Sequence, residues 1–138
     1  MSRRPLLLDT CAVIFVVRGA PLTQEAEACL ADASATGRPT MVSPITAWEI
    51  GMLVAKGRLV LTSRPLDWFT MLIARGLELA PMTPDILIAS SFLDASDLRD
   101  PADRIIAATA EHLDYEIVTR DRPLLNYAAA GHIRAVPC

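Results

Sequence analysis

The sequence is poor in lysine, histidine, cysteine and aromatic residues. Lys56 is the only lysine, there are 2 histidines and 3 cysteines, and aromatic residues make up 5% of the 138 residues. The cysteines, Cys11, Cys29 and Cys138, are odd in number and fit no zinc-binding spacing. This pattern argues against a disulfide scaffold and favours a reducing compartment. We expect Cys11 and Cys29 to be small buried apolar residues.

The sequence also lacks a long apolar run. Ser2-Arg3-Arg4-Pro5 faintly resembles a twin-arginine export signal, and the apolar segment 11–17 follows it. However, Asp9 lies inside the would-be hydrophobic region, where a carboxylate is costly. Arg18 ends the run well short of the ~20 residues that a membrane span needs. We therefore expect no export signal, no membrane association and a cytoplasmic protein.

A basic surplus is missing as well. The 16 acidic residues outnumber the 13 Lys and Arg residues, so the net charge is −3, whereas generic nucleic-acid binders are usually basic. Almost all the positive charge is arginine, which suits bidentate contacts to phosphate or carboxylate. With 52% hydrophobic and 21% charged residues, the chain is not disordered. Its length predicts one domain, residues 1–138.

Short apolar strands alternate with helices along the chain. We expect strands at 6–8, 40–42, 77–79, 116–118 and 134–136, and helices at 23–35, from Ser43-Pro44 to a stop at Gly57, and at 65–75, 84–93 and 100–113, with a turn at 120–123. This alternation is typical of βαβ units. It predicts an α/β fold of three layers, with a short, mainly parallel central sheet between helices.

Four acidic residues lie just after the expected strands or near the beginnings of the expected helices. Asp9 comes directly after the first strand, Glu49 lies in the second turn of the helix after the second strand, Asp103 begins the helix before the 116–118 strand, and Asp121 follows that strand. In open parallel sheets, sites form at the carboxyl ends of the strands. A cluster of oxygen ligands favours Mg²⁺ or Mn²⁺. Two such ions can promote hydrolysis of a phosphodiester bond.

Each of these carboxylates also has a structural interpretation. Asp9 and Asp100 are suitable helix caps, Asp103 suits the positive end of a helix dipole, and Asp121 suits a turn. Glu49 is harder to explain in this way, because helical spacing places it along an apolar stripe beside Trp48. A carboxylate there needs either an arginine partner or a metal ion.

Four motifs in order carry a family resemblance. They are Leu-Leu-Leu-Asp-Thr at 6–10, Ser-Pro-Ile-Thr-Ala-Trp-Glu-Ile at 43–50 with Lys-Gly-Arg-Leu at 56–59, Asp-Pro-Ala-Asp-Arg-Ile-Ile-Ala-Ala-Thr-Ala at 100–110, and Val-Thr-Arg-Asp at 118–121. Together they resemble a PIN domain, most closely the VapC toxin ribonucleases of bacterial type II toxin–antitoxin pairs. The resemblance covers nearly the whole chain, and Cys11 is a departure from the residues common at that position.

The resemblance implies a site, a cofactor and partners. It makes Asp9, Glu49, Asp103 and Asp121 the catalytic, metal-binding carboxylates of a ribonuclease that uses Mg²⁺ or Mn²⁺, and Thr119 a support for the metal or its water. It implies an RNA substrate, for which tRNA and rRNA are candidates. It also implies a cognate VapB-like antitoxin and a homodimer. The apolar residues of 45–55 and 68–73 are a candidate dimer or antitoxin face, with core packing as the alternative.

Three arginines adjoin the acidic residues. Arg104, Arg120 and Arg122 are candidate phosphate ligands, and pairing with the neighbouring acids is the alternative. Asp100 matches the first acidic residue of its motif, and we expect it to be a helix cap with a minor electrostatic role. Removing the four cluster acids leaves 12 acidic against 13 basic residues, a net charge of +1. The acidic total therefore does not argue against an RNA substrate.

Other classes fit less well. A haloacid-dehalogenase-type phosphatase needs a second aspartate where this chain has Cys11, and a receiver domain needs a lysine near the last strand. A non-catalytic interaction module would leave Glu49 unexplained. A structure-specific DNA nuclease shares the chemistry, but the chain lacks obvious arch or clamp insertions.

Overall fold

The computed structural model describes residues 3–138, so Met1 and Ser2, where the export-like segment begins, lie outside it. The elements of the described part, in chain order, are β1 (Leu6–Leu8), α1 (Thr10–Arg18), α2 (Gln24–Thr36), β2 (Thr40–Val42), α3 (Pro44–Ala55), α4 (Pro65–Ala74), β3 (Glu78–Leu79), α5 (Pro84–Ala89), α6 (Pro101–Leu113), β4 (Glu116–Thr119), α7 (Arg122–Ala129) and β5 (Arg134–Pro137). The expected alternation of short strands and helices is confirmed.

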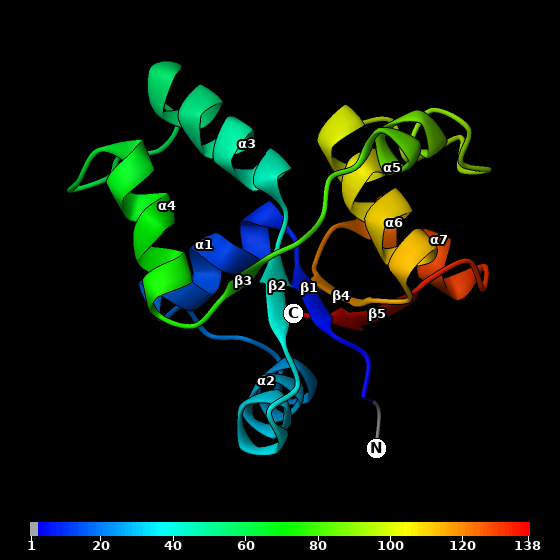
Figure 1. Ribbon diagram of the computed structural model, residues 1–138, viewed down its shortest axis with the longest axis horizontal. Helices are drawn as coiled ribbons and strands as arrows, with labels where there is room; N and C mark the ends of the chain where they lie inside the picture. Colours follow the sequence, from blue (N-terminus) through cyan, green and yellow to red (C-terminus); the bar gives the residue numbers. More distant parts are fainter. Residues whose placement is uncertain (1–2) are drawn as a thin grey trace.

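The strands form one five-stranded sheet in the order β3-β2-β1-β4-β5. Every neighbouring pair is parallel, and in the central pairs Leu7 lies opposite Met41 on one side and Ile117 on the other. The chain builds outward from β1 to β2 and β3, then crosses back to place β4 and β5 on the other side of β1 (Figure 1). The carboxyl ends of β1 and β4 therefore form the point where the winding direction reverses, which is where α/β sheets place their sites.

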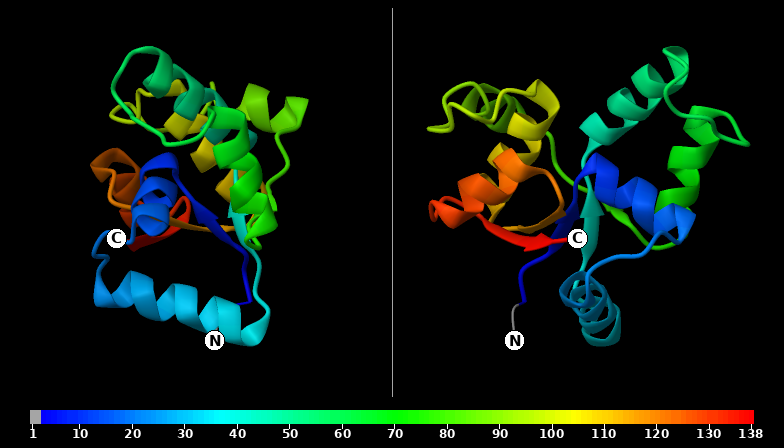
Figure 2. Two further views of the ribbon diagram at one scale, coloured as in Figure 1. Left: turned by 90° about the vertical axis from the view of Figure 1, so that its left-hand side faces the viewer. Right: turned by 180° about the vertical axis from the view of Figure 1, so that it is seen from behind.

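Helices cover both faces of the sheet, which confirms the three-layer α/β fold. Leu6 and Leu8 point to one face and pack with residues of α1, α2, α3 and α4. Leu7 points to the other face and packs with residues of α6 and α7. Figures 1 and 2 show α1, α3 and α4 on one side of the sheet and α5, α6 and α7 on the other. Strands buried on both faces need continuous apolar sequence, which is what the three leucines of β1 supply.

The structure contains two helices that the sequence pattern did not predict. The apolar segment 11–17 forms most of α1, with Asp9 as its N-cap, and α7 begins inside the expected turn at 120–123, with Asp121 as its N-cap and Pro123 in its first turn. Both helices begin directly after an aspartate cap that lies one or two residues beyond a strand, and an aspartate that caps a helix resembles one in a turn when read as sequence. In addition, α5 ends at Ala89, four residues before the expected end at Leu93.

The prediction for the cysteines was wrong for Cys11, which is exposed, whereas Cys29 is half-buried and Cys138 is buried. Cys11 lies in the first turn of α1, on a side that the core does not cover, while its neighbours Ala12 and Val13 point into the core. In the described part of the chain, no helix is both long and apolar enough to cross a membrane.

Candidate active site

The reversal point of the sheet brings together Asp9 and the end of β4. Leu8, the last residue of β1, lies opposite Val118, so Asp9, directly after β1, lies beside Thr119, the last residue of β4. Asp121 follows two residues later and caps α7. Glu49 arrives from α3, which begins directly after β2, and Asp103 from the first turn of α6. We call Asp9, Glu49, Asp103 and Asp121 the acidic cluster.

Asp9 is the most tightly held carboxylate of the cluster. It is 2% exposed, its Oδ1 accepts a hydrogen bond from the Ala12 amide at 2.7 Å, and its Oδ2 accepts one from the Thr119 hydroxyl. Burial raises the pKa of Asp9, the two hydrogen bonds oppose this, and the charge of Asp121 raises it further. The Thr119 oxygen also accepts the Asp121 amide at 2.9 Å. One buried hydroxyl thus ties two members of the cluster together.

Glu49 is held by a chain of two threonine hydroxyls. The Thr10 hydroxyl donates to Oε1 of Glu49. Because a threonine has one hydroxyl proton, the 3.0 Å contact between Thr10 and Thr46 must then be donated by Thr46. Thr46 is fully buried and lies one turn before Glu49 on α3. Burial raises the pKa of Glu49, and the Thr10 hydrogen bond partly offsets this rise.

Asp103 experiences the strongest combined field of the cluster. Burial, together with the charges of Asp100, Asp121, Glu49 and Asp9, raises the pKa of its carboxyl to about 8. Asp100 caps α6, as expected, by accepting the Ala102 amide at 3.1 Å. Its charge is, however, the strongest electrostatic influence on both Asp103 and Glu49. The role of Asp100 as a cap is thus confirmed, and its electrostatic role stays a prediction.

The Cys11 thiol lies within the electrostatic influence of all four cluster carboxylates. Partial burial of the thiol, followed by the charges of Asp9, Asp103, Glu49 and Asp121, raises the pKa of Cys11 to about 11. Within residues 3–138, none of the four cluster carboxylates is in a salt bridge, so the alternative of an arginine partner for Glu49 is not realised there.

The donor chemistry of the cluster suits a hard divalent cation. Four carboxylates converge with unneutralised charge, and such oxygen ligands favour Mg²⁺ or Mn²⁺. In the described residues, however, no three His, Cys, Asp or Glu side chains form a ready-made metal-binding group. Asp9, Glu49, Asp103 and Asp121 are the residues that could hold such an ion, and they would have to move closer together around it.

The three candidate phosphate ligands have different surroundings. Arg104 donates to the backbone carbonyls of the segment before α6, at Ser90, Leu93, Ala95 and Leu98, over 2.6–3.1 Å. This corrects the expectation that Arg104 binds phosphate, because four of its N–H bonds already fasten that loop. Arg120 donates to the carbonyl of Cys138 at 2.9 Å and stacks 3.8 Å from the centre of the Phe15 ring. Arg122 is exposed at the start of α7.

The sequence interpretation missed the positioning roles of Thr10 and Thr46. Both belonged to motifs that were recognised, yet only the carboxylates were assigned a function. Thr10 directly follows Asp9, and Thr46 precedes Glu49 by three residues, one helical turn on the same face. A small hydroxyl residue one turn from a half-buried carboxylate is a signal that could have identified Thr46.

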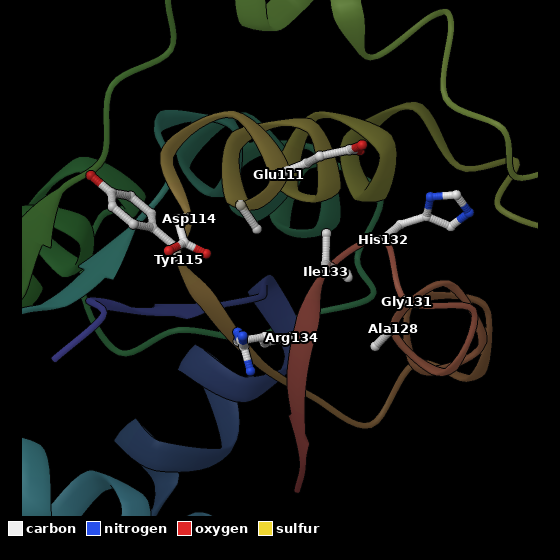
Figure 3. Close-up of a pocket in the computed structure, with 9 residues that line it drawn as sticks. Glu111, Asp114, Tyr115, Ala128, Gly131, His132, Ile133 and Arg134 are labelled. Atoms are coloured by element: carbon white, nitrogen blue, oxygen red, sulfur yellow. The ribbon is translucent and has the colours of Figure 1, made fainter. Parts of the chain in front are cut away.

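A hollow of about 440 Å³ lies at the other end of the sheet. Figure 3 shows its lining residues, which include Glu111 and Asp114 near the end of α6, and His132 and Arg134 near the start of β5. Several of these groups have partners, since Glu111 accepts the Tyr127 hydroxyl at 2.6 Å and Asp114 pairs with Arg4 at 2.8 Å. The acidic cluster, not this hollow, is the candidate active site.

Comparisons with known proteins give a family model and a relative of the chain. The family model described as PIN domain matches residues 6–130. The ribonuclease VapC22 of Mycobacterium tuberculosis is 33% identical over 86 residues, which are 62% of this chain and 65% of that protein, just under two thirds of its length.

Solved structures share the fold across the chain. VapBC2 from Rickettsia felis, bound to a DNA fragment from its promoter, matches with a TM-score of 0.70 at 13% identity, over 97% of this chain and 98% of that chain. DNA-bound VapBC from Salmonella typhimurium matches with a TM-score of 0.67 at 22% identity, over the same 97% and 98%.

Proposed function

Because the chain belongs to the PIN domain family, we propose that it is a divalent-metal-dependent endoribonuclease that acts as the toxin of a type II toxin–antitoxin pair. The observation that carries the proposal is the convergence of four carboxylates, none of them in a salt bridge within residues 3–138, at the reversal point of the sheet. If these carboxylates were only helix caps, there would be no reason for Glu49, which lies on α3 and caps no helix, to approach the other three. Its approach costs free energy, because like charges that lie close together repel each other.

The proposal assigns Asp9, Glu49, Asp103 and Asp121 to one or two Mg²⁺ or Mn²⁺ ions. A bound ion of this kind lowers the pKa of water and stabilises negative charge on phosphate oxygens. The protein's own contribution is orientation: Thr119 and the Ala12 amide hold both oxygens of Asp9, while Thr10 holds Glu49. The carboxyl of Asp103, with a pKa of about 8 before any cation binds, can hold a proton near neutral pH.

The proposal also covers partners. We infer that the substrate is RNA, with Arg120 and Arg122 as phosphate contacts beside the cluster. The similarity to a ribonuclease and to VapBC structures supports an RNA substrate and a VapB-like antitoxin. We further propose that the protein forms a homodimer and acts in the cytoplasm, where an inhibitory partner would protect cellular RNA.

The central test is metal-dependent cleavage. Purified protein is incubated with total RNA and with a DNA flap substrate, in EDTA, Mg²⁺ or Mn²⁺, and new 5′ ends are mapped. We expect discrete RNA cleavage with either ion and none in EDTA. RNA cleavage that survives EDTA would overturn the metal mechanism. Cleavage of DNA alone would identify a structure-specific DNA nuclease, and intact RNA and DNA in every buffer would favour a non-catalytic module.

Substitutions in the cluster provide the matched test. Asp9→Asn, Glu49→Gln and Asp103→Asn should each lower the cleavage rate on the order of 1,000-fold or more, because several kcal/mol of transition-state stabilisation are lost. Asp94→Asn, an exposed carboxylate in the loop before α6, should leave the rate unchanged. Asp100→Asn keeps the helix cap and should be far milder than Asp103→Asn. Equal losses for these two would show that the motif was assigned wrongly.

A further inference from the structure

Trp48 is an exposed aromatic residue immediately before a carboxylate of the acidic cluster. It is 57% exposed, whereas the other tryptophan, Trp68, is 8% exposed and packs in the core. Among the described residues, Trp48 takes part in no ring stacking or cation–π contact. The structure therefore separates the two tryptophans, since Trp68 serves the fold and Trp48 does not.

Helix geometry places Trp48 on the flank of the site. Ile45 packs into the core beneath α6, and Met52 lies two turns later on nearly the same line of α3. At about 100° per residue, Trp48 projects about 60° to one side of that line and Glu49 about 40° to the other. Ile50 is buried on the side that faces α4, so Trp48 lies on the side away from α4. In Figure 1, α3 leans away from α6 toward its C-terminal end, which leaves this side of α3 uncovered by ribbon.

Beyond Glu49, the next charged residues along the chain are cationic. Lys56 and Arg58 follow Trp48 with no acidic residue between Glu49 and Asp67, whereas Arg64 lies at the start of α4 and pairs with Asp67 at 2.9 Å. Lys56 caps the C-terminal end of α3, seven residues after Glu49 and about 10 Å further along the helix. Trp48 therefore lies between the acidic cluster and a cationic segment. Proteins that bind single-stranded nucleic acid combine exposed aromatic rings, on which bases stack, with cationic side chains that neutralise phosphates.

We infer that Trp48 is a base-stacking residue, which positions an unpaired nucleobase next to the scissile phosphodiester while Lys56 contacts a phosphate further along the strand. The inference rests on the proposed function and deepens it, because it selects RNA segments whose bases are free to stack. A base within a duplex keeps its own neighbours on both faces, so it cannot offer a face to Trp48.

Fluorescence isolates the residue, because removing Trp68 leaves Trp48 as the only tryptophan. The protein carries Trp68→Phe and Asp103→Asn, so that RNA is bound but not cut, and Mg²⁺ is present throughout. The probe is a 12-nucleotide oligoadenylate, alone or annealed to oligouridylate. We expect the single strand to quench the Trp48 emission and the duplex to quench it far less.

Binding to fluorescein-labelled oligoadenylate, measured by anisotropy, gives the magnitude. Trp48→Ala should raise Kd about 5- to 150-fold, the range typical of one base stacked on an aromatic ring. Trp48→Phe should restore most of the affinity. The matched control is Phe92→Ala, which removes an aromatic side chain that is 82% exposed in the turn after α5. It should change Kd less than twofold.

In protein that retains Asp103, Trp48→Ala should raise KM for a short oligoribonucleotide more than it lowers kcat, as expected when a binding contact is lost.

The possible outcomes separate this inference from the proposed function. If the wild type cleaves RNA but Trp48→Ala leaves Kd and KM unchanged, or duplex and single strand quench equally, the stacking role is overturned and the ribonuclease stands. If Trp48 emission is insensitive to RNA and Trp48→Ala dissociates a dimer in sedimentation, the surface is a protein interface instead. If neither binding nor cleavage of RNA occurs, both proposals fail.

Discussion

Strands β1, β2 and β4 meet charged groups at both ends, and the two ends handle charge in opposite ways. At their amino ends, Arg38 donates to Glu116 at 2.7 Å and to the carbonyl of Arg4, which links the segments leading into the three strands. At their carboxyl ends the same strands lead to Asp9, Glu49 and Asp121, all of one sign and without an ion pair in the described part of the chain.

The difference suits a division of roles, in which the amino ends serve stability and the carboxyl ends serve the chemistry that we propose. The Arg38 and Glu116 side chains are 5% and 19% exposed, so their charges are compensated in a poorly solvated setting. The acidic cluster is also partly buried, but its charges raise one another's pKa values. A fold keeps such repulsion where a ligand relieves it.

The largest effect on stability is expected at the amino ends. Arg38→Met leaves the Glu116 carboxylate without its partner and should lower the free energy of unfolding by about 3 kcal/mol, near the low end for a broken buried pair because Glu116 keeps some contact with water. Urea denaturation measures this. The double variant Arg38→Met/Glu116→Met should recover most of the loss. A loss below about 1 kcal/mol for Arg38→Met would mean that this ion pair is as dispensable as a surface pair.

An intermediate effect is expected from Asp103, with the opposite sign. Its folded pKa of about 8 lies well above the ordinary aspartate value of 3.8, so between these pH values the folded state holds a proton that the unfolded chain releases. The unfolding free energy of metal-free protein should therefore fall as pH rises from about 4 to about 8. Asp103→Asn should remove much of this slope and melt a few degrees higher than the wild type at pH 8 in EDTA.

The remaining slope belongs to Asp9 and Glu49, whose pKa values burial also raises. Asp94→Asn is the control and should retain the full slope. Adding Mn²⁺ should raise the melting temperature of the wild type more than that of Asp103→Asn. If Asp103→Asn is instead less stable than the wild type at pH 8, the Asp103 carboxylate stabilises the folded state through its own contacts. The contrast between the two ends of the sheet would then disappear.

The smallest effect is expected for the second ion pair at the amino ends. Arg4 and Asp114 are 2.8 Å apart, but their side chains are 32% and 70% exposed, and exposed pairs contribute little. Asp114 has a φ of 58°, a conformation that asparagine also tolerates. Asp114→Asn should thus change the unfolding free energy by less than about 0.5 kcal/mol. A loss comparable to that of Arg38→Met would show that burial is not what distinguishes the two pairs.

The sequence predicts the acidic carboxyl ends of the strands but not the ion pairs at their amino ends. The strands, the helices α2, α3, α4 and α6 and the four carboxylates follow from apolar runs, caps and four recognisable motifs. The partners could not be predicted, because Arg38 and Glu116 are 78 residues apart and Thr119 and Asp9 are 110 apart. Arg104 illustrates the same limit, since only the folded loop reveals that its guanidinium is occupied by backbone carbonyls.

The hydrogen bond from Thr119 to Asp9 has a consequence for the synthesis of the chain on the ribosome. Asp9 leaves the ribosome 110 residues before Thr119, whose hydroxyl holds the Asp9 carboxylate, and Asp121, which completes the cluster, comes later still. Until β4 has been synthesised and has inserted beside β1, a nascent chain carries an incomplete site. The strand order thus sets the time of assembly, because the carboxylates of the cluster can meet only after most of the chain has been synthesised.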